Sequence, residues 1–86
     1  MREFKYIIKD PMGFHARPVG MMSKLVSKQK ALVTVHFGQQ SADCRRLYQV
    51  LGLGIKQKDE VLFRIEGENE EDVESDLLNL FKNENL

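Results

Sequence analysis

Alternating apolar and polar positions predict four strands along the chain. Residues 4–9, 31–37 and 60–66 place apolar side chains at every second position, the spacing that buries one face of a strand. Gly38 and Gln39 suit a hairpin turn after the second of these segments, which leads into a short polar strand at residues 40–43. The side chains expected to face inward are Phe4, Tyr6, Ile8, Ala31, Val33, Val35, Phe37, Val61, Phe63 and Ile65.

Apolar residues three or four positions apart predict two longer helices. The first spans residues 16–28 and holds Pro18 in its first turn, where the missing N–H costs no helical hydrogen bond. The last follows Asn69, a residue type that caps helices through its side chain. A shorter helix at residues 46–52 ends in glycine. The expected buried stripes are Val19, Met22 and Val26 in the first helix, and Val73, Leu77 and Leu80 in the last.

The predicted elements follow the order β-α-β-β-α-β-α. Hairpin-like links and strands with one apolar face favour a mostly antiparallel sheet that helices cover on one side. The pattern therefore indicates an α+β fold, and 86 residues suit a single domain over residues 1–86.

Composition and charge exclude several classes of function. Thirteen basic and thirteen acidic residues leave no net charge, which argues against a general nucleic-acid binder. The single cysteine, Cys44, cannot form an internal disulfide, and no apolar run suits a signal peptide or membrane insertion. We expect a cytoplasmic protein with no cofactor. No Cys or His stands at ligand spacing around His36, so we expect no metal site.

The strongest chemical signal is the segment Gly-Phe-His-Ala-Arg-Pro at residues 13–18. It places an imidazole where a turn becomes a helix, and the first N–H groups of a helix bind anions. Arg17 can add a guanidinium, whose donors match a phosphate group. A neutral imidazole is nucleophilic and can carry a phosphoryl group, so His15 is the candidate acceptor. From the residues alone the alternative stays open, because a lone histidine at a helix start is more often a cap or a surface residue.

The segment at residues 13–18 resembles the active-site signature of HPr, the histidine-containing phosphocarrier family of the bacterial phosphoenolpyruvate:sugar phosphotransferase system. Residues 46–55, Arg-Leu-Tyr-Gln-Val-Leu-Gly-Leu-Gly-Ile, are similar to the second-helix signature of that family. Residues 66–71, Glu-Gly-Glu-Asn-Glu-Glu, are similar to the acidic turn before its last helix. The three matches are in register, and the resemblance covers essentially the whole chain.

The resemblance implies a fold and a role. The fold is an open-faced β-sandwich, a four-stranded antiparallel sheet with three helices on one face. The role is that of a phosphocarrier, which is not itself an enzyme. His15 accepts a phosphoryl group on its δ nitrogen from Enzyme I and passes it to the IIA domains of sugar permeases. Arg17 helps to hold the phosphoryl group and to steer these partners. We expect a monomer.

A docking surface is expected beside His15. Arg17, Gly20 and Lys24 recur at helical spacing and share one face of the first helix. By the resemblance, this face and the second helix flank His15, and an apolar patch with a charged rim is typical of transient interfaces. Core packing is the alternative for Leu47 and Leu51. The expected partner-binding residues are Ala16, Gly20, Met21, Lys24, Leu47, Tyr48 and Leu51, with Arg45 and Arg46 on the rim.

Three positions depart from the family pattern. Val19 and Gly20 replace a pair of small residues, often Ala-Ala or Ala-Thr. Arg46 stands where many relatives from low-GC Gram-positive bacteria carry a serine that a regulatory kinase phosphorylates. These departures leave open an alternative function, that of an HPr-like regulatory or binding module whose phosphorylation state controls a partner protein.

Because Arg46 has no hydroxyl group, we predict that a metabolite-activated HPr kinase leaves this protein unmodified. Neither Ser41 nor Ser75 stands at the matching position. Mass spectrometry after incubation with the kinase and ATP measures the outcome, and a serine phosphate would contradict the prediction.

Overall fold

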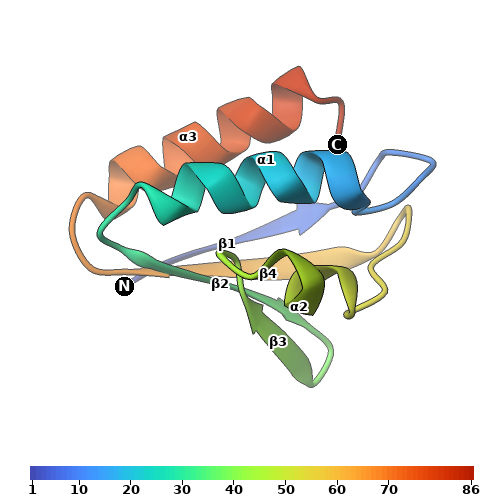
Figure 1. Ribbon diagram of the computed structural model, residues 1–86, viewed down its shortest axis with the longest axis horizontal. Helices are drawn as coiled ribbons and strands as arrows, with labels where there is room; N and C mark the ends of the chain where they lie inside the picture. Colours follow the sequence, from blue (N-terminus) through green and yellow to red (C-terminus); the bar gives the residue numbers. More distant parts are fainter.

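A computed structural model describes residues 1–86 and contains four strands and three helices (Figure 1). Their order is β-α-β-β-α-β-α, as the sequence predicts. The strands are β1 (Arg2–Ile7), β2 (Leu32–Phe37), β3 (Gln40–Asp43) and β4 (Glu60–Glu66). The helices are α1 (Ala16–Ser27), α2 (Leu47–Leu51) and α3 (Glu70–Asn83).

The four strands form one antiparallel sheet in the order β1-β4-β2-β3. The register pairs Phe4 with Phe63 and Phe63 with Val35, so the predicted inward-facing positions of three strands line up in one row. The bounds predicted for β1 were two residues late at each end. The ladder begins where Arg2 pairs with Ile65, and Ile8 lies beyond it, although its side chain is fully buried as expected.

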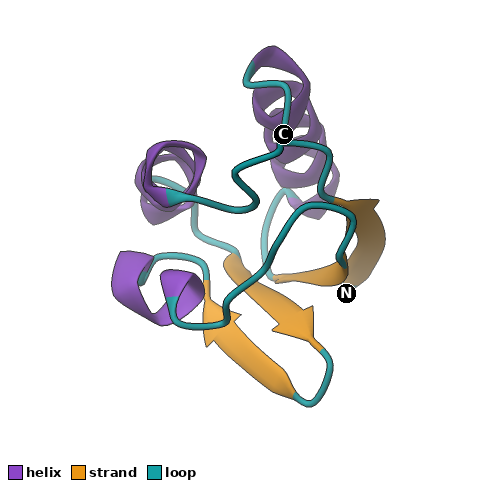
Figure 2. Ribbon diagram, turned by 90° about the vertical axis from the view of Figure 1, so that its right-hand side faces the viewer, coloured by secondary structure: helices purple, strands orange, loops and turns teal.

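The helices cover one face of this sheet, with α1 and α3 side by side over it and α2 packed against α1 and β3 (Figure 2). The core between the layers is one cluster of 19 buried residues, contributed by strands and helices alike. The predicted fold class, an open-faced α+β sandwich, is therefore confirmed. None of the helices has both the length and the apolar character needed to cross a membrane.

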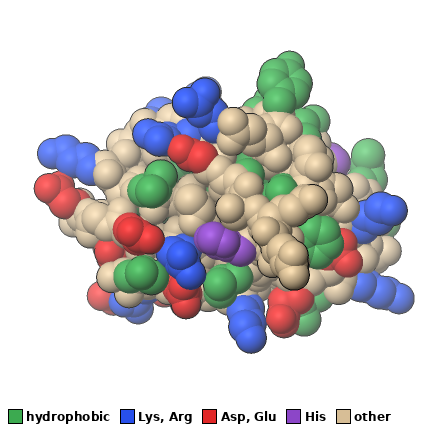
Figure 3. All heavy atoms as spheres, turned by 90° about the horizontal axis from the view of Figure 1, so that it is seen from below, with side chains coloured by type: hydrophobic (Ala, Val, Ile, Leu, Met, Phe, Trp, Pro, Cys, Tyr) green, Lys and Arg blue, Asp and Glu red, His purple; other side chains and the backbone are tan.

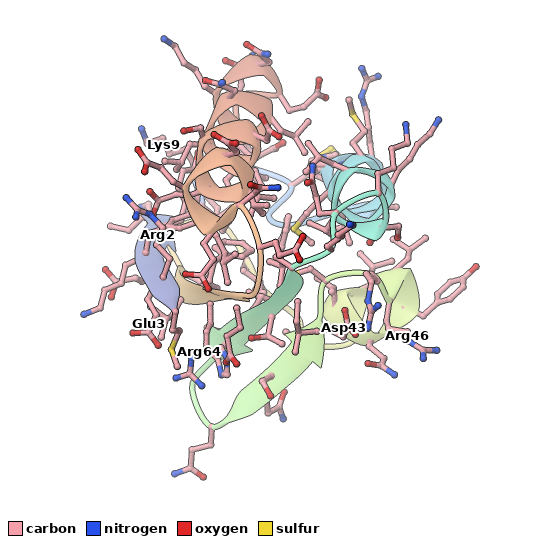
Figure 4. All side chains as sticks on the ribbon, turned by 90° about the vertical axis from the view of Figure 1, so that its left-hand side faces the viewer. Arg2, Glu3, Lys9, Asp43, Arg46 and Arg64 are labelled. Carbon is pink, nitrogen blue, oxygen red and sulfur yellow. The ribbon has the colours of Figure 1, made fainter.

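The opposite face of the sheet carries mixed charges and scattered apolar groups (Figure 3). Glu3 and Arg64, which are cross-strand neighbours, form an ion pair with 2.8 Å between Oε2 and Nε (Figure 4). On β2, His36 Nε2 lies 3.0 Å from Thr34 Oγ1. His36 thus lies on the outer strand face, as the alternation in its segment predicts. Its ring nitrogen is hydrogen-bonded to Thr34 of the same strand.

Two details predicted for α3 were wrong. Asn69 stands at the cap position, but its φ of 58° is left-handed and its side chain makes no capping hydrogen bond, whereas a capping side chain ordinarily projects from extended backbone. Glu70 Oε2 instead accepts the Gly67 N–H at 2.8 Å. The third buried residue of the stripe is Phe81 rather than Leu80, because the buried face advances in steps of four residues.

Cys44 is fully buried in the core cluster. Burial and the neighbouring Asp43 carboxylate raise the pKa of its thiol far above the usual range. A thiol in this environment stays protonated and unreactive, so Cys44 acts as a packed apolar residue.

Candidate functional site

The segment before α1 is a tight turn pressed against the loop that precedes β4. Gly13 has a φ of +71°, and its N–H donates to the Asp10 carbonyl at 2.8 Å. A Cβ atom at this position would lie 2.7 Å from the Ile55 carbonyl oxygen and 2.9 Å from Lys56 Cα. Only glycine meets both demands, the left-handed backbone and the close approach of two chain segments.

Phe14 anchors this turn in the core. Its side chain is 5% exposed and meets the rings of Phe63 and Phe81 edge-on, with centroids 6.3 Å apart in both pairs. Its N–H donates to the Ile55 carbonyl at 3.1 Å. With Phe14 held inward, the next residue of the chain stands at the surface.

His15 is that next residue and forms the N-cap of α1. Its backbone is extended, with φ −96° and ψ 179°, and its side chain does not cap the helix. The imidazole is one-quarter exposed, and its Nε2 lies 3.0 Å from Asp10 Oδ2. Capping of α1 by the His15 side chain is thereby excluded, because the ring points back to the preceding turn and not into its own helix.

Asp10 is the site residue that sequence reasoning missed. Its other carboxylate oxygen, Oδ1, accepts the Met12 N–H at 2.9 Å. This backbone donor, and secondly His15, hold the pKa of the Asp10 carboxyl below its usual range. In the sequence, Asp-Pro-Met-Gly signals only a turn, so nothing there indicates that the second oxygen of Asp10 faces the imidazole.

The first turn of α1 has N–H groups without a partner inside the helix. The first intrahelical hydrogen bond runs from the Val19 N–H to the His15 carbonyl at 3.1 Å. The N–H groups of Ala16 and Arg17 precede it and have no acceptor within the helix. The Arg17 side chain is 76% exposed, and its Nε donates to Glu84 Oε1 at 3.2 Å. In this state Arg17 therefore contacts the C-terminal end of α3 rather than the imidazole.

The comparisons with known proteins agree on one family. A family model described as "PTS HPr component phosphorylation site" matches residues 2–83. The chain belongs to the HPr family. It is accordingly a phosphocarrier of the phosphotransferase system, as the resemblance in its sequence implies.

Individual relatives support the assignment. The phosphocarrier protein HPr of Mycoplasma genitalium is 32% identical over 73 residues, which cover 84% of this chain and 83% of that protein. HPr of Thermoanaerobacter tengcongensis superposes with a TM-score of 0.88 at 27% identity, covering 95% of this chain and 92% of that one. A mycoplasma histidine-containing phosphocarrier protein has a TM-score of 0.90 at 22% identity, with 93% and 91% covered, which supports the fold.

On α1, the residues expected to bind HPr partners form a partly exposed surface. Met21 is 39% exposed and Lys24 is exposed. Both line a groove of about 420 Å³ between α1 and α3, together with Leu25, Lys28, Gln29 and Leu80. Gly20 is half-buried, and a Cβ atom there would meet no neighbour within 4 Å, so close packing does not require this glycine.

The second half of the expected HPr docking surface lies on α2. Only Val50 of this helix is buried, while Leu47 and Leu51 are half-buried against the core. Tyr48 is 84% exposed and has no packing role. Ser23 Oγ donates to the Cys44 carbonyl at 2.7 Å and ties α1 to the turn before α2. The two helices are thus held beside each other.

The two arginines expected on the rim differ in their surroundings. Arg45 is paired with Asp43, with 2.8 Å between Nη2 and Oδ2. Arg46 caps α2 with its backbone, forms no ion pair, and projects outward from this side of the molecule (Figure 4). In this HPr the position next to Leu47 therefore carries a free cation.

Gly13→Ala is predicted to destabilise the protein and to slow phosphoryl transfer. The added methyl group meets two backbone atoms at less than 3.0 Å, and the turn that carries His15 must shift. We expect this overlap to lower the free energy of unfolding by about 1–3 kcal/mol beyond the cost of the positive φ. Denaturant unfolding and transfer rates measure the two effects.

Gly38→Ala is the matched control. Gly38 also has a positive φ, +61°, but a Cβ atom there would meet nothing within 4 Å. We expect it to lose only the conformational cost, about 1–2 kcal/mol, and to keep its transfer rate. Equal losses in the two variants would contradict the role assigned to the close approach at Gly13.

Proposed function

We propose that His15 is the phosphoryl acceptor of this phosphocarrier, charged by Enzyme I and discharged by the IIA domains of sugar permeases. The observation that carries the proposal is the placement of His15 at the exposed start of α1, held by Asp10 and followed by Arg17. The Nδ1 lone pair attacks phosphorus while the bond between phosphorus and the donor atom of Enzyme I breaks, and its electron pair stays with the donor. The second transfer reverses these roles.

Arg17 would hold the phosphoryl group after an exchange of partners. Its present contact with Glu84 is an exposed ion pair, a kind of interaction that contributes about 0.2–1 kcal/mol. A phosphoryl group on His15 offers more negative charge and better-matched acceptors than one carboxylate. Arg17 can therefore leave Glu84 at low cost when the ring is charged. The N–H groups of Ala16 and Arg17 would add helix-terminal donors to the same site.

The docking surface of the proposal comprises Ala16, Gly20, Met21, Lys24, Leu47, Tyr48 and Leu51. The exposure of Tyr48 and the partial exposure of Met21 support it, since these apolar groups are not needed inside the fold. Lys24 and Arg46 would favour acidic partner surfaces and speed the encounter. With no phosphorylatable side chain at position 46, docking would escape control by a serine kinase.

We further propose that residues 1–86 form one HPr domain that acts as a monomer in the cytoplasm and is not an enzyme by itself. A buried, unpaired Cys44 suits a reducing compartment. A carrier with one phosphorylated histidine and no substrate cleft beside it needs partner enzymes for every transfer. No observation favours the alternative, a module that only regulates a partner protein.

Charging by Enzyme I tests the acceptor. After incubation with Enzyme I, magnesium and phosphoenolpyruvate, we expect the intact mass to rise by one acid-labile phosphate. His15→Ala should show no gain. His36→Ala, which changes the other histidine, on the open face of the sheet, should charge normally. Discharge on addition of IIA domains would complete the cycle, while charging of His15→Ala would contradict the proposal.

Tyr48→Ala is predicted to slow transfer without harming the fold. Because Tyr48 is 84% exposed, we expect the free energy of unfolding to change by less than about 0.5 kcal/mol. Loss of a docking contact worth about 1–2 kcal/mol should slow transfer five- to thirtyfold at low protein concentration. Leu47→Ala should also slow transfer, with a larger effect on stability because its side chain is half-buried.

Leu32→Ala is the control for the docking variants. Leu32 is 41% exposed, but it lies on β2, on the face of the sheet opposite the helices. We expect wild-type transfer from this variant. Wild-type transfer rates in well-folded Tyr48→Ala and Leu47→Ala proteins would refute the assigned docking surface.

A further inference from the structure

The Asp10 carboxylate is divided between two tasks. Oδ1 accepts the Met12 N–H at 2.9 Å and so closes the turn, while Oδ2 lies 3.0 Å from His15 Nε2. The backbone of Asp10 is fixed as well, since its carbonyl accepts the Gly13 N–H and its N–H donates to the Leu86 carbonyl. With four contacts on one residue, the oxygen that faces the imidazole has little freedom to move.

Because Oδ1 is already bonded to the Met12 N–H, the kind of hydrogen bond that Oδ2 can form with the His15 ring is restricted. A carboxylate that already accepts a backbone N–H is stabilised as the anion, and an anion only accepts hydrogen bonds. The 3.0 Å contact is therefore a hydrogen bond only if Nε2 carries the proton. In a neutral imidazole with its proton on Nε2, the lone pair is on Nδ1.

We propose that Asp10 is a positioning residue that keeps the proton of His15 on Nε2 and so presents Nδ1 to the incoming phosphoryl group. The inference rests on the proposed function of His15, and it names the group that selects the reactive nitrogen. A carboxylate behind a histidine ring acts in the same way in many metal and catalytic sites, where it fixes the tautomer and the orientation of the ring.

The contact between Asp10 and Nε2 also stabilises the positive charge that the imidazole gains when it is phosphorylated. When the Nδ1 lone pair forms the bond to phosphorus and the bond to the donor breaks, both ring nitrogens are substituted and the ring becomes cationic. The Nε2 proton stays in place, 3.0 Å from the Asp10 carboxylate, so no proton has to move in either transfer. When the phosphoryl group leaves, the electron pair of the broken bond returns to Nδ1 and the ring is neutral again.

Asparagine at position 10 separates positioning from turn formation. In Asp10→Asn the amide oxygen can still accept the Met12 N–H, but the amide NH₂ group then faces His15 Nε2. A donor at that place favours a lone pair on Nε2 and moves the proton to Nδ1. Asp10→Ala removes both contacts and leaves the ring without a preference. A positioning role therefore predicts that Asn slows transfer more than Ala does, whereas a turn-forming role alone predicts the opposite order.

The first measurement is independent of phosphoryl transfer. Proton–nitrogen correlation spectra of the uncharged full chain, at a pH of about 8.5 where an imidazole is ordinarily neutral, report which ring nitrogen of His15 carries the proton. We expect Nε2–H in the wild type, a predominance of Nδ1–H in Asp10→Asn and a mixture in Asp10→Ala. Nδ1–H in the wild type would overturn the inference even if every Asp10 variant failed to fold.

The second measurement is the rate of transfer from Enzyme I. We expect Asp10→Asn to be about tenfold to hundredfold slower than the wild type, the usual effect of losing a residue that orients a reactive histidine, and Asp10→Ala to lie between the two. The control is Glu70→Gln. Glu70 also closes a turn by accepting a backbone N–H, from Gly67, but it lies at the N-terminal end of α3, and we expect the wild-type rate.

The outcomes separate this inference from the proposed function. A wild-type protein that is never charged would overturn the function, while its spectra still report the tautomer of His15. A charged wild type with Asp10→Asn at the same rate, or with Asp10→Ala slower than Asp10→Asn, would overturn the positioning role and leave the carrier function intact. Nε2–H in the wild type with the order wild type, Ala, Asn in decreasing rate would support it.

Discussion

The burial of Phe14 is the contact on which the presentation of His15 depends. Its ring meets Phe63 of the central strand β4 and Phe81 of α3, so sheet and helix layer both hold it. Neighbouring side chains on an extended backbone point in opposite directions, and the extended conformation of His15 turns its ring outward. Gly13 lets the same turn press against Ile55 from the other side. His15 is thus partly exposed, while both residues before it are immobilised.

The rest of the site is assembled from segments distant in sequence. The Leu86 carbonyl accepts the N–H groups of Lys9 and Asp10, and Glu84 pairs with Arg17, 67 residues away. In Figure 1 the C-terminus lies beside the loop that enters α1. The end of α3 therefore supports the turn that carries His15. The stability of α3 and the geometry of the site are linked for this reason, although α3 contributes no reactive group.

Much of the fold could be predicted from the sequence because its strands have one buried face, and alternation reports such a face directly. The chemistry proposed for His15 could be inferred from the sequence because it depends on local order, a glycine turn followed by a helix. What could not be predicted depends on geometry. Phe81 replaces Leu80 in the buried stripe because the axis of α3 fixes which side of the helix meets Tyr6 and Phe63. Asp10 faces His15 because a turn closed by its own backbone brings residues five apart together.

A carrier that serves successive partners needs a nucleophile in a fixed position and a cation that can change its contacts. In the proposed site these are His15 and Arg17, and their side chains differ in how far they are exposed to solvent. The imidazole is 25% exposed, Asp10 holds its Nε2, and the neighbouring Phe14 is anchored in the core. The Arg17 side chain is 76% exposed and is held by a single ion pair that solvent screens. Under the proposed function, the less exposed contacts are those that must survive every transfer, and the exposed pair is the one that must break. His15 and Arg17 lie only two positions apart, yet the fold holds the first in place and leaves the second free to exchange its partner.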